Sequence, residues 1–568
     1  MNGRDAHYDR KRGLRRLVHL EGVAKQAIDI SHVRLIAVAA GFALCFVIIA
    51  GRLIGLAALA PANESTAIPA EVRQLKAERA EVVDRNGVLL ASNVRAVSLF
   101  ANPRKVMNAD QATTQLVSVL PGLNRASLQR KLSSDRGFVW VKRHLSPHQQ
   151  DSVNRLGIPG LEFVDEERRV YPHGRLAAHV VGFTGIDNEG LEGIEKGLDA
   201  SLVAGHDVRL SIDARVQHAL RAELMASVEE FQAIGAAAII MDAHNGEILG
   251  MVSLPDFDPG AMSKVSTDDR RFNRATLGVY EMGSTFKAFT TAALLESGTA
   301  NLNDTYDASK PLHVAHFTIN DDHAKNRWLS VAEVFQYSSN IGSARMALDI
   351  GTEGQQQFLR SLGLLDRPSL EIPEVGAPDL PSPWREISTM TVAYGHGIAV
   401  SPLQMVRAYG VVVNGGHDVT PTLLARDDGD RAVPKRILSE HTSQTMRALL
   451  RLVVDAGTGH QAQAEGYLVG GKTGTAEKPC AGGYCRKALL SSFVAAFPIN
   501  DPRYVVFVAL DEPQGNERTS NFAGAGWTAA PTTSRVVSRI APLLGVAPTT
   551  RTLSATADSL LVSVRKGG

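Results

Sequence analysis

Ser284 and Lys287 are the pair of side chains best spaced for chemistry, in Ser-Thr-Phe-Lys at the start of a predicted helix over residues 284–298. Residues three apart share one face of a helix, so the ammonium of the lysine can reach the serine hydroxyl. A partly desolvated lysine can lose its proton and act as a general base, whereas a solvated lysine with a pKa of about 10.4 cannot. Unpaired N–H groups at the helix N-terminus would stabilise an oxyanion beside the serine. The pair predicts a serine nucleophile activated by a lysine.

Two further motifs strengthen this prediction because of their order in the chain. Ser-x-x-Lys alone is a weak signal, since it recurs at residues 563–566 in the C-terminal tail. Ser-x-Asn follows at Ser338 and Asn340, and this pattern also recurs, at residues 152–154. Lys-Thr-Gly then occupies residues 472–474 on a strand-like run. The ordered triple, with one motif at a helix start and one on a strand, indicates acyl transfer.

The second motif and two backbone groups can serve the reacting centre. Ser338 can relay a proton to a departing amine, and Asn340 can hydrogen-bond the peptide backbone of a substrate. The N–H groups of Ser284 and Thr475 would complete an oxyanion hole, in which losing one donor typically costs about 3 kcal/mol.

The third motif can hold the substrate. The charge of Lys472 and the hydroxyls of Thr473 and Thr475 can bind a terminal carboxylate. Gly474 leaves the strand bare, so that a substrate can lie against it as an added strand. The chain has no HExxH, no clustered metal ligands and no cofactor motif, so we expect neither a metal nor a cofactor.

The elements that must position these residues are strands, then helices, then strands. Strand patterns cover residues 235–253, 467–476, 488–498 and 504–511, and helical patterns cover 214–231, 284–298, 340–363, 401–413, 441–457 and 527–543. This order predicts an α+β fold in which one antiparallel sheet carries an inserted helical subdomain. Upstream, Asp84-Arg85-Asn86-Gly87 is typical of a hairpin turn within a mixed region of short strands.

The N-terminal region predicts a membrane anchor. Residues 1–34 hold eight basic and four acidic side chains, a net charge of +4, and residues 35–51 hold no charge. The apolar run resumes after Arg52 and is long enough to cross about 30 Å of hydrocarbon. The basic flank predicts a cytoplasmic N-terminus and an exported remainder. A soluble core helix and a signal peptide cleaved after Ala60 are alternatives, but the length of the run and the long basic flank favour an anchor.

Composition excludes several classes of protein. The 568 residues are 44% hydrophobic and 21% charged, which is unlike a disordered chain. Sixty Lys and Arg against 59 Asp and Glu give a net charge of +1, so no overall field favours nucleic acid. Three cysteines are too few for a disulfide scaffold.

Beyond the triple, several segments resemble the class B penicillin-binding proteins. They are RAEVVDRNGVLLASN (79–93), RRVYPHGRLAAHVVGFTG (168–185), GLEGIEKGLD (190–199), YEMGSTFK (280–287), AYGHGIAVSPLQM (393–405) and GYLVGGKTGTAEK (466–478). The charge and hydropathy pattern predicts a cytoplasmic tail over 1–34 and a transmembrane helix over 35–60, and a composition rich in Thr, Ser and Ala predicts a flexible tail over 546–568. The resemblance implies an elongated mixed α/β pedestal or dimerisation domain over 61–225 and a transpeptidase domain over 226–545.

The resemblance implies a peptidoglycan DD-transpeptidase. Ser284 would attack the D-Ala-D-Ala bond of a stem peptide, and a neighbouring stem amine would take the acyl group; β-lactams would acylate the same serine. The catalytic domain would be periplasmic, on a single-pass anchor in the inner membrane. The length and the cytoplasmic segment are most similar to the division-specific type, with a SEDS-family glycan polymerase and other divisome membrane proteins as partners. An elongation-specific enzyme is the alternative.

The chain departs from the family pattern in few places. Met282 stands where proline is usual before the nucleophile. Cys480 and Cys485 flank a predicted turn after Lys-Thr-Gly, where a disulfide and two reduced thiols are both open. Cys45, in the membrane segment, is interpreted as a small apolar residue.

Other functions are less well supported by the sequence. A class A β-lactamase needs a glutamate in an ExxLN pattern, but the residues three before the two Leu-Asn pairs are Leu120 and Thr299. A two-function synthase would need an acidic glycosyltransferase signature before the peptidase, and a β-lactam sensor would need a larger cytoplasmic or membrane part. A non-catalytic scaffold is the alternative of another class; the presence of every catalytic residue type argues against it.

Overall fold

The computed structural model describes residues 23–59, 79–261, 269–314, 317–426, 434–480 and 483–549. It divides into two compact units, residues 1–75 and 76–568. Most of the predicted C-terminal tail, with the second Ser-x-x-Lys at 563–566, lies outside the described residues, as does the basic segment before residue 23.

The first unit contains the helix α1 (Val23–Leu59). Its window Val33–Leu53 has a mean hydropathy of 2.5 over 21 residues and none of it is buried. At 1.5 Å per residue this window is about 31 Å long, the thickness of the hydrocarbon core. A helix that is apolar on all sides and unburied is typical of a membrane span. The helix starts before the predicted segment 35–60 and includes Arg52.

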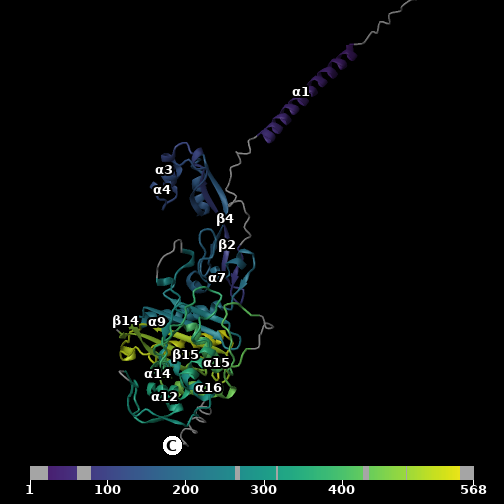
Figure 1. The fold of residues 1–568 in the computed structure, drawn as a ribbon. Coiled ribbons are helices and arrows are strands. Elements are labelled where there is room, and N and C mark those ends of the chain that lie inside the picture. The colour runs from purple at the N-terminus through teal and green to yellow at the C-terminus, as the bar shows by residue number, and fades with distance from the viewer. Residues whose placement is uncertain are drawn as a thin grey trace, which may run out of the picture. The chain divides into compact units, whose positions relative to one another are not determined.

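A five-stranded sheet organises the predicted pedestal. Its strands follow the order β3-β2-β1-β5, with β4 also paired to β2, and β2 and β4 run side by side (Figure 1). Their bounds are β1 Val82–Val83, β2 Leu89–Ala101, β3 Val139–Leu145, β4 Leu161–Val170 and β5 Val208–Arg209. The predicted hairpin turn is confirmed: Asp84 Oδ1 accepts from the N–H groups of Asn86 (2.7 Å) and Val88 (2.8 Å), and Gly87 has a φ of 83°.

Short helices complete the pedestal. They are η1 Pro103–Lys105, α3 Ala109–Val119, α4 Arg125–Leu132, α5 Pro147–Asn154, η2 Gly174–Ala177, α6 Ala178–Val181, α7 Gly193–Gly197 and α8 Asp199–Val203. The other Ser-x-Asn, at 152–154, ends α5, where Ser152 Oγ donates to the carbonyl of His148.

A buried ion cluster ties three parts of the pedestal together. Glu195 in α7 has no exposed side-chain surface, and its two carboxylate oxygens accept from Arg79 Nε at 2.6 Å and Arg169 Nε at 2.7 Å. Buried charges are tolerated only when paired and hydrogen-bonded. These residues therefore fix the start of the pedestal and β4 to α7.

The second sheet is antiparallel and has the order β14-β15-β16-β6-β7, as the strand-helix-strand pattern predicts. Its strands are β6 Gly235–Asp242, β7 Ile248–Leu254, β14 Gly470–Cys480, β15 Gly483–Phe497 and β16 Tyr504–Asp511. Strand β14, which carries Lys-Thr-Gly, is at one end of this order and so leaves one edge without a strand partner from the described sheet.

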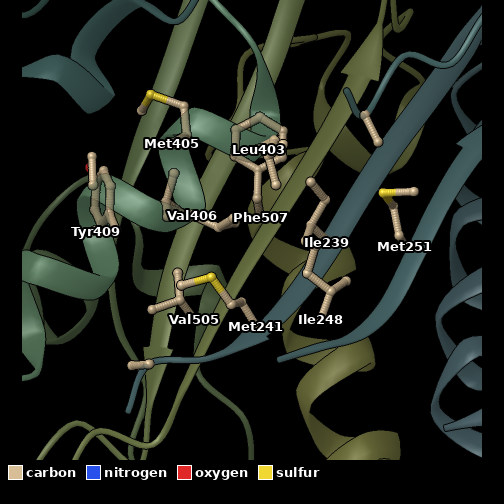
Figure 2. Close-up of a cluster of buried hydrophobic side chains, with 14 of the residues drawn as sticks. Ile239, Met241, Ile248, Met251, Leu403, Met405, Val406, Tyr409, Val505 and Phe507 are labelled. Carbon is tan, nitrogen blue, oxygen red and sulfur yellow. The ribbon is translucent and has the colours of Figure 1, made fainter. Parts of the chain in front are cut away.

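Alternate residues of β6 divide the core between the two faces of this sheet. Ile239 and Met241 pack with α15 (Pro402–Val413) on one face (Figure 2), whereas Ala238 and Ile240 pack with α9 and α17 on the other. Helix α9 spans Ala214–Glu230 and α17 spans Ala529–Leu543. The predicted domain boundary at 225/226 falls inside α9, which packs on β7 and α17 as one helix. We therefore propose a boundary before Ala214.

The inserted subdomain lies between β7 and β14 in the chain. Its helices are η3 Pro259–Ala261, η4 Asp269–Arg271, η5 Gly283–Phe286, α10 Lys287–Glu296, α11 Val331–Tyr337, α12 Asn340–Ile350, α13 Thr352–Ser361, α14 Glu386–Val392, α15 Pro402–Val413, α16 Glu440–Ala456 and η6 His460–Ala462. Its strands are β8 Tyr280–Glu281, β9 Thr305–Asp307, β10 Leu312–Val314, β11 Phe317–Ile319, β12 Trp328–Ser330 and β13 Ala399–Val400; η7 Glu517–Thr519 follows β16. The predicted helix over 340–363 is interrupted at Gly351, whose φ of 76° is not helical.

Candidate active site

Ser284 lies in a 3₁₀ turn, η5, that leads directly into α10, so the predicted helix start is confirmed with a tighter first turn. The turn is packed against β14: a Cβ added to Gly283 would lie 2.7 Å from the carbonyl oxygen of Thr475. Gly283 has a φ of 55°, and its N–H donates to the carbonyl of Gly395 at 3.2 Å. Met282 is buried, and its carbonyl accepts from Thr285 Oγ1 at 2.8 Å. Close packing thus fixes the backbone on both sides of the serine.

Lys287 is buried, and its side-chain nitrogen is surrounded by oxygen acceptors from the Ser-x-x-Lys and Ser-x-Asn motifs. Its Nζ lies 2.7 Å from Ser284 Oγ, 2.7 Å from Asn340 Oδ1 and 2.7 Å from the carbonyl oxygen of Ser338. Burial lowers the pKa of Lys287 to about 7, against the smaller raising effect of two nearby carboxylates. The lysine can therefore lose its proton near neutral pH while it contacts the serine hydroxyl.

Ser338 connects the two lysines. It ends α11 in the left-handed conformation, with a φ of 62°. Its Oγ lies 3.1 Å from Lys287 Nζ and 2.9 Å from Lys472 Nζ. Burial lowers the pKa of Lys472 well below its usual value, and the charge of Lys287 lowers it further. Hydrogen bonds thus run without a gap from Ser284 Oγ through Lys287 and Ser338 to Lys472.

The loop before β12 holds the Ser-x-Asn motif in place. Asp321 accepts from Ser339 Oγ at 2.7 Å and from the N–H of Ile341 at 2.9 Å. The amide Nδ2 of Asn340 donates to the carbonyl of Asn320 at 2.9 Å. Sequence reasoning missed Asp321, because nothing in the spacing of the motifs indicates an acid in this loop.

The threonines on β14 have partners outside the three motifs. Thr473 Oγ1 lies 2.7 Å from Thr458 Oγ1, and Thr475 Oγ1 accepts from the N–H of Ala525 at 3.0 Å. Thr473 is buried, and Thr475 is exposed. Thr458 had no signal in the sequence, since it follows α16 in a loop without a recognisable motif.

Gly474 has a structural role in addition to the expected one. A Cβ at this position would lie 2.4 Å from the carbonyl oxygen of Met282 and 2.7 Å from Ser492 Oγ. The face of the strand on which a side chain would project therefore packs against the turn that carries Ser284. The edge of β14, along which an added strand would bind, has no strand partner from the described sheet. The glycine permits the turn that carries Ser284 and strand β14 to approach each other.

A cleft of about 440 Å³ opens over these residues. Of the predicted side chains, Ser284, Ser338, Thr473 and Thr475 line it. Lys287 and Lys472 are buried, and Lys287 contacts both Ser284 and Asn340. Other lining residues are Asp322, His323, Lys325, Gln336, Tyr337, Ala456, Gly457, Thr458, His460, Gly524, Ala525, Gly526 and Trp527. Three segments far apart in sequence thus meet at one cleft.

Cys480 and Cys485, for which both redox states were open, form a disulfide. The bond closes the tip of the hairpin between β14 and β15, where Cys480 pairs with Gly483 and Lys478 pairs with Cys485. Cys45 is a free thiol on α1.

Comparison with known families and proteins agrees with this arrangement. The family model of the penicillin-binding protein transpeptidase domain matches residues 236–530, and that of the penicillin-binding protein dimerisation domain matches residues 74–209. The first match alone covers more than half of the chain.

Individual relatives match over most of their length. The chain is 39% identical to the probable peptidoglycan D,D-transpeptidase FtsI of Caulobacter vibrioides, over 91% of this chain and 90% of that protein. It is 32% identical to the probable peptidoglycan D,D-transpeptidase PenA of Neisseria gonorrhoeae, over 84% of this chain and 86% of that protein.

A solved structure shares the fold. The crystal structure of a peptidoglycan synthetase from Bifidobacterium adolescentis superposes with a TM-score of 0.67 at 22% identity, and covers 85% of this chain and 98% of its own. With both domain families matched in order and the motif residues gathered at one cleft, the chain belongs to the class B penicillin-binding proteins.

Proposed function

We propose that the protein is a peptidoglycan DD-transpeptidase with Ser284 as its nucleophile. The observation that carries this proposal is the unbroken contact from Ser284 Oγ through Lys287 Nζ and Ser338 Oγ to Lys472 Nζ, at 2.7, 3.1 and 2.9 Å. Neutral Lys287 removes the hydroxyl proton as the serine attacks the carbonyl of the penultimate D-Ala. The oxyanion forms beside the N–H groups of Ser284 and Thr475.

Departure of D-Ala completes acylation, and attack by the acceptor amine then reverses the proton path. Ser338 passes a proton to the departing D-Ala amine and is itself reprotonated from the lysines. An amine of a neighbouring stem then attacks the acyl-serine, gives up its proton along the same path, and leaves a cross-link and a free Ser284. Asn340 contacts Lys287 and is directed to the same reacting centre.

Residues on β14 are suited to recognise the end of the stem peptide. Lys472 can supply positive charge, because a bound carboxylate favours the protonated form of a nearby lysine. The hydroxyls of Thr473 and Thr475 line the cleft beside Ser284. Together they would hold the carboxylate of the terminal D-Ala by charge-assisted hydrogen bonds. A β-lactam carries a carboxylate at the corresponding place, so it would acylate the same serine.

The setting proposed for this reaction is the division septum at the inner membrane. Helix α1 has the length and composition of a single span, and the basic residues before it favour a cytoplasmic N-terminus and a periplasmic catalytic domain. The naming of the Caulobacter relative as FtsI supports the division role over the elongation role. The partners proposed are a SEDS-family glycan polymerase and other divisome membrane proteins.

A fluorescent penicillin tests the nucleophile. Full-length wild-type protein in detergent should become covalently labelled on a denaturing gel, whereas Ser284→Ala should not, although its circular dichroism spectrum and melting temperature match those of the wild type. Native wild-type protein that remains unlabelled, or a labelled Ser284→Ala, would contradict the proposal.

Localisation and depletion test the division role. A tagged copy should gather at the septum, and depletion should produce filaments, because cells would grow without completing septa. Rounded cells with an evenly distributed protein would favour the elongation alternative.

A further inference from the structure

Glu281 lies three residues before Ser284 and joins three separate segments outside the residues that line the cleft. Its Oε1 accepts from the N–H of Gly397 at 3.0 Å and from the hydroxyl of Tyr484 at 2.8 Å. Its Oε2 lies 3.1 Å from His396 Nδ1. The carboxylate is thus a junction between β8, the 396–397 segment and the β14–β15 hairpin tip.

The hairpin tip contacts the same segment through an aromatic ring. The rings of Tyr484 and His396 lie 4.5 Å apart between centroids. Tyr484 is adjacent to Cys485, whose disulfide with Cys480 closes the tip. Burial, followed by the neighbouring Glu281 carboxylate, raises the pKa of Tyr484, so its hydroxyl remains a donor over the physiological range.

The residues that contact Glu281 are connected to Ser284 by a few backbone hydrogen bonds. Strand β8 pairs with β13, Glu281 facing Ala399, and leads directly into η5. The carbonyl of Gly395, one residue before His396, accepts from the N–H of Gly283. A Cβ at Gly395 would lie 2.2 Å from the carbonyl oxygen of Gly283. A shift of Glu281 or of the 395–397 segment would therefore move the backbone that presents Ser284.

We propose that Tyr484, presented by the disulfide-closed hairpin tip, is a positioning residue for the acylation of Ser284, acting through Glu281. This inference rests on the proposed function. Tyr484, on β15, links the tip of the β14–β15 hairpin, whose strand β14 carries Lys-Thr-Gly, to the strand that leads to Ser284. The disulfide keeps the tyrosine in reach of the carboxylate, so that the backbone N–H groups of Ser284 and Thr475 keep their spacing. Small misplacements of reacting groups are costly in rate.

The first test removes one hydroxyl. Tyr484→Phe keeps the ring on His396 and loses the hydrogen bond to Glu281. The rate constant for acylation by a fluorescent penicillin at saturation should fall roughly three- to tenfold, the value of one hydrogen bond to a partly exposed charge. The dissociation constant of the initial complex should change little, because Tyr484 does not line the cleft. Tyr306→Phe is the matched control: it loses a hydroxyl-carboxylate bond of the same length, 2.8 Å to Asp349.

The second test opens the disulfide with a small dithiol. One dithiol thiolate attacks a cystine sulfur to give a mixed disulfide, and its second thiol closes a cyclic disulfide; Cys480 and Cys485 gain the two electrons and two protons as thiols. Cys45 is already a thiol and is unchanged. The reduced wild type should be acylated about as slowly as the oxidised Tyr484→Phe variant. Reduction should slow Tyr484→Phe little further, because reduction and the substitution both break the same link from the hairpin tip to Glu281. The Cys480→Ser, Cys485→Ser double variant should behave like the reduced protein.

Several outcomes would overturn the inference. One is an acylation rate constant for Tyr484→Phe that equals that of the wild type or of Tyr306→Phe. Another is an unchanged rate after reduction that mass spectrometry shows to be complete, and a third is fully additive effects of the two changes. Failure of the proposed function is a distinct result, since wild-type protein would then not be labelled at all.

Discussion

The rate of acylation should depend on pH through Lys287. Burial lowers the pKa of Lys287 to about 7. In the mechanism proposed above the neutral amine is the base, so the acylation rate should rise with pH and level off above this value. A single ionisation with that pKa leaves about one-tenth of the lysine neutral at pH 6, one-half at pH 7 and nine-tenths at pH 8. The rate constant should therefore increase roughly tenfold from pH 6 to pH 8.

Stopped-flow measurements with a penicillin whose carboxylate stays ionised over this range give the profile directly. Lys287→Arg is the control, because a guanidinium keeps the positive charge but cannot lose its proton. Its acylation rate should fall by about 10²–10⁴-fold and lose its pH dependence between pH 6 and pH 8. A wild-type profile that is flat over this range, or one whose midpoint lies near the pKa of a solvated lysine, would refute the assignment of Lys287 as the base.

Two substitutions test the packing around the site and in the pedestal. Gly474→Ala places a methyl group 2.4 Å from the carbonyl oxygen of Met282. We expect the free energy of unfolding in denaturant to fall by about 1–3 kcal/mol and acylation to become slower. An unchanged unfolding free energy and an unchanged acylation rate would contradict the packing described. Glu195→Ala leaves Arg79 and Arg169 buried without their shared carboxylate. The free energy of unfolding should therefore fall by about 3–5 kcal/mol. A melting temperature equal to that of the wild type would show that the cluster does not stabilise the protein.

Local signals in the sequence were sufficient for the sheet and for the identity of the motif residues. The turn at 84–87 and the strands around 245–246 have glycine and asparagine where tight turns need them. The order of strands and helices predicted the antiparallel sheet with its insertion. The roles of the eight predicted site residues remain predictions, although the structure brings them together.

What could not be predicted depends on contacts between residues distant in the chain. Asp321 holds the Ser-x-Asn motif from a loop without a motif of its own, and Tyr484 meets Glu281 across 203 positions. The packing reason for Gly474 was missed because the sequence does not show that this face of β14 lies against the turn that carries Ser284, and its role in binding a substrate strand stays a prediction. The break at Gly351 in the predicted helix over 340–363 was missed, since one glycine within an otherwise helical pattern is often tolerated.

Formation of cross-links by the purified protein tests the central claim most directly. Full-length protein would be incubated with uncross-linked peptidoglycan strands that carry pentapeptide stems, and the digested product analysed by mass spectrometry. Wild type should form cross-linked muropeptides and release one D-Ala for each cross-link, whereas Ser284→Ala should form neither. Cross-links formed equally by Ser284→Ala, or the absence of cross-links from wild-type protein that a fluorescent penicillin labels, would contradict the account.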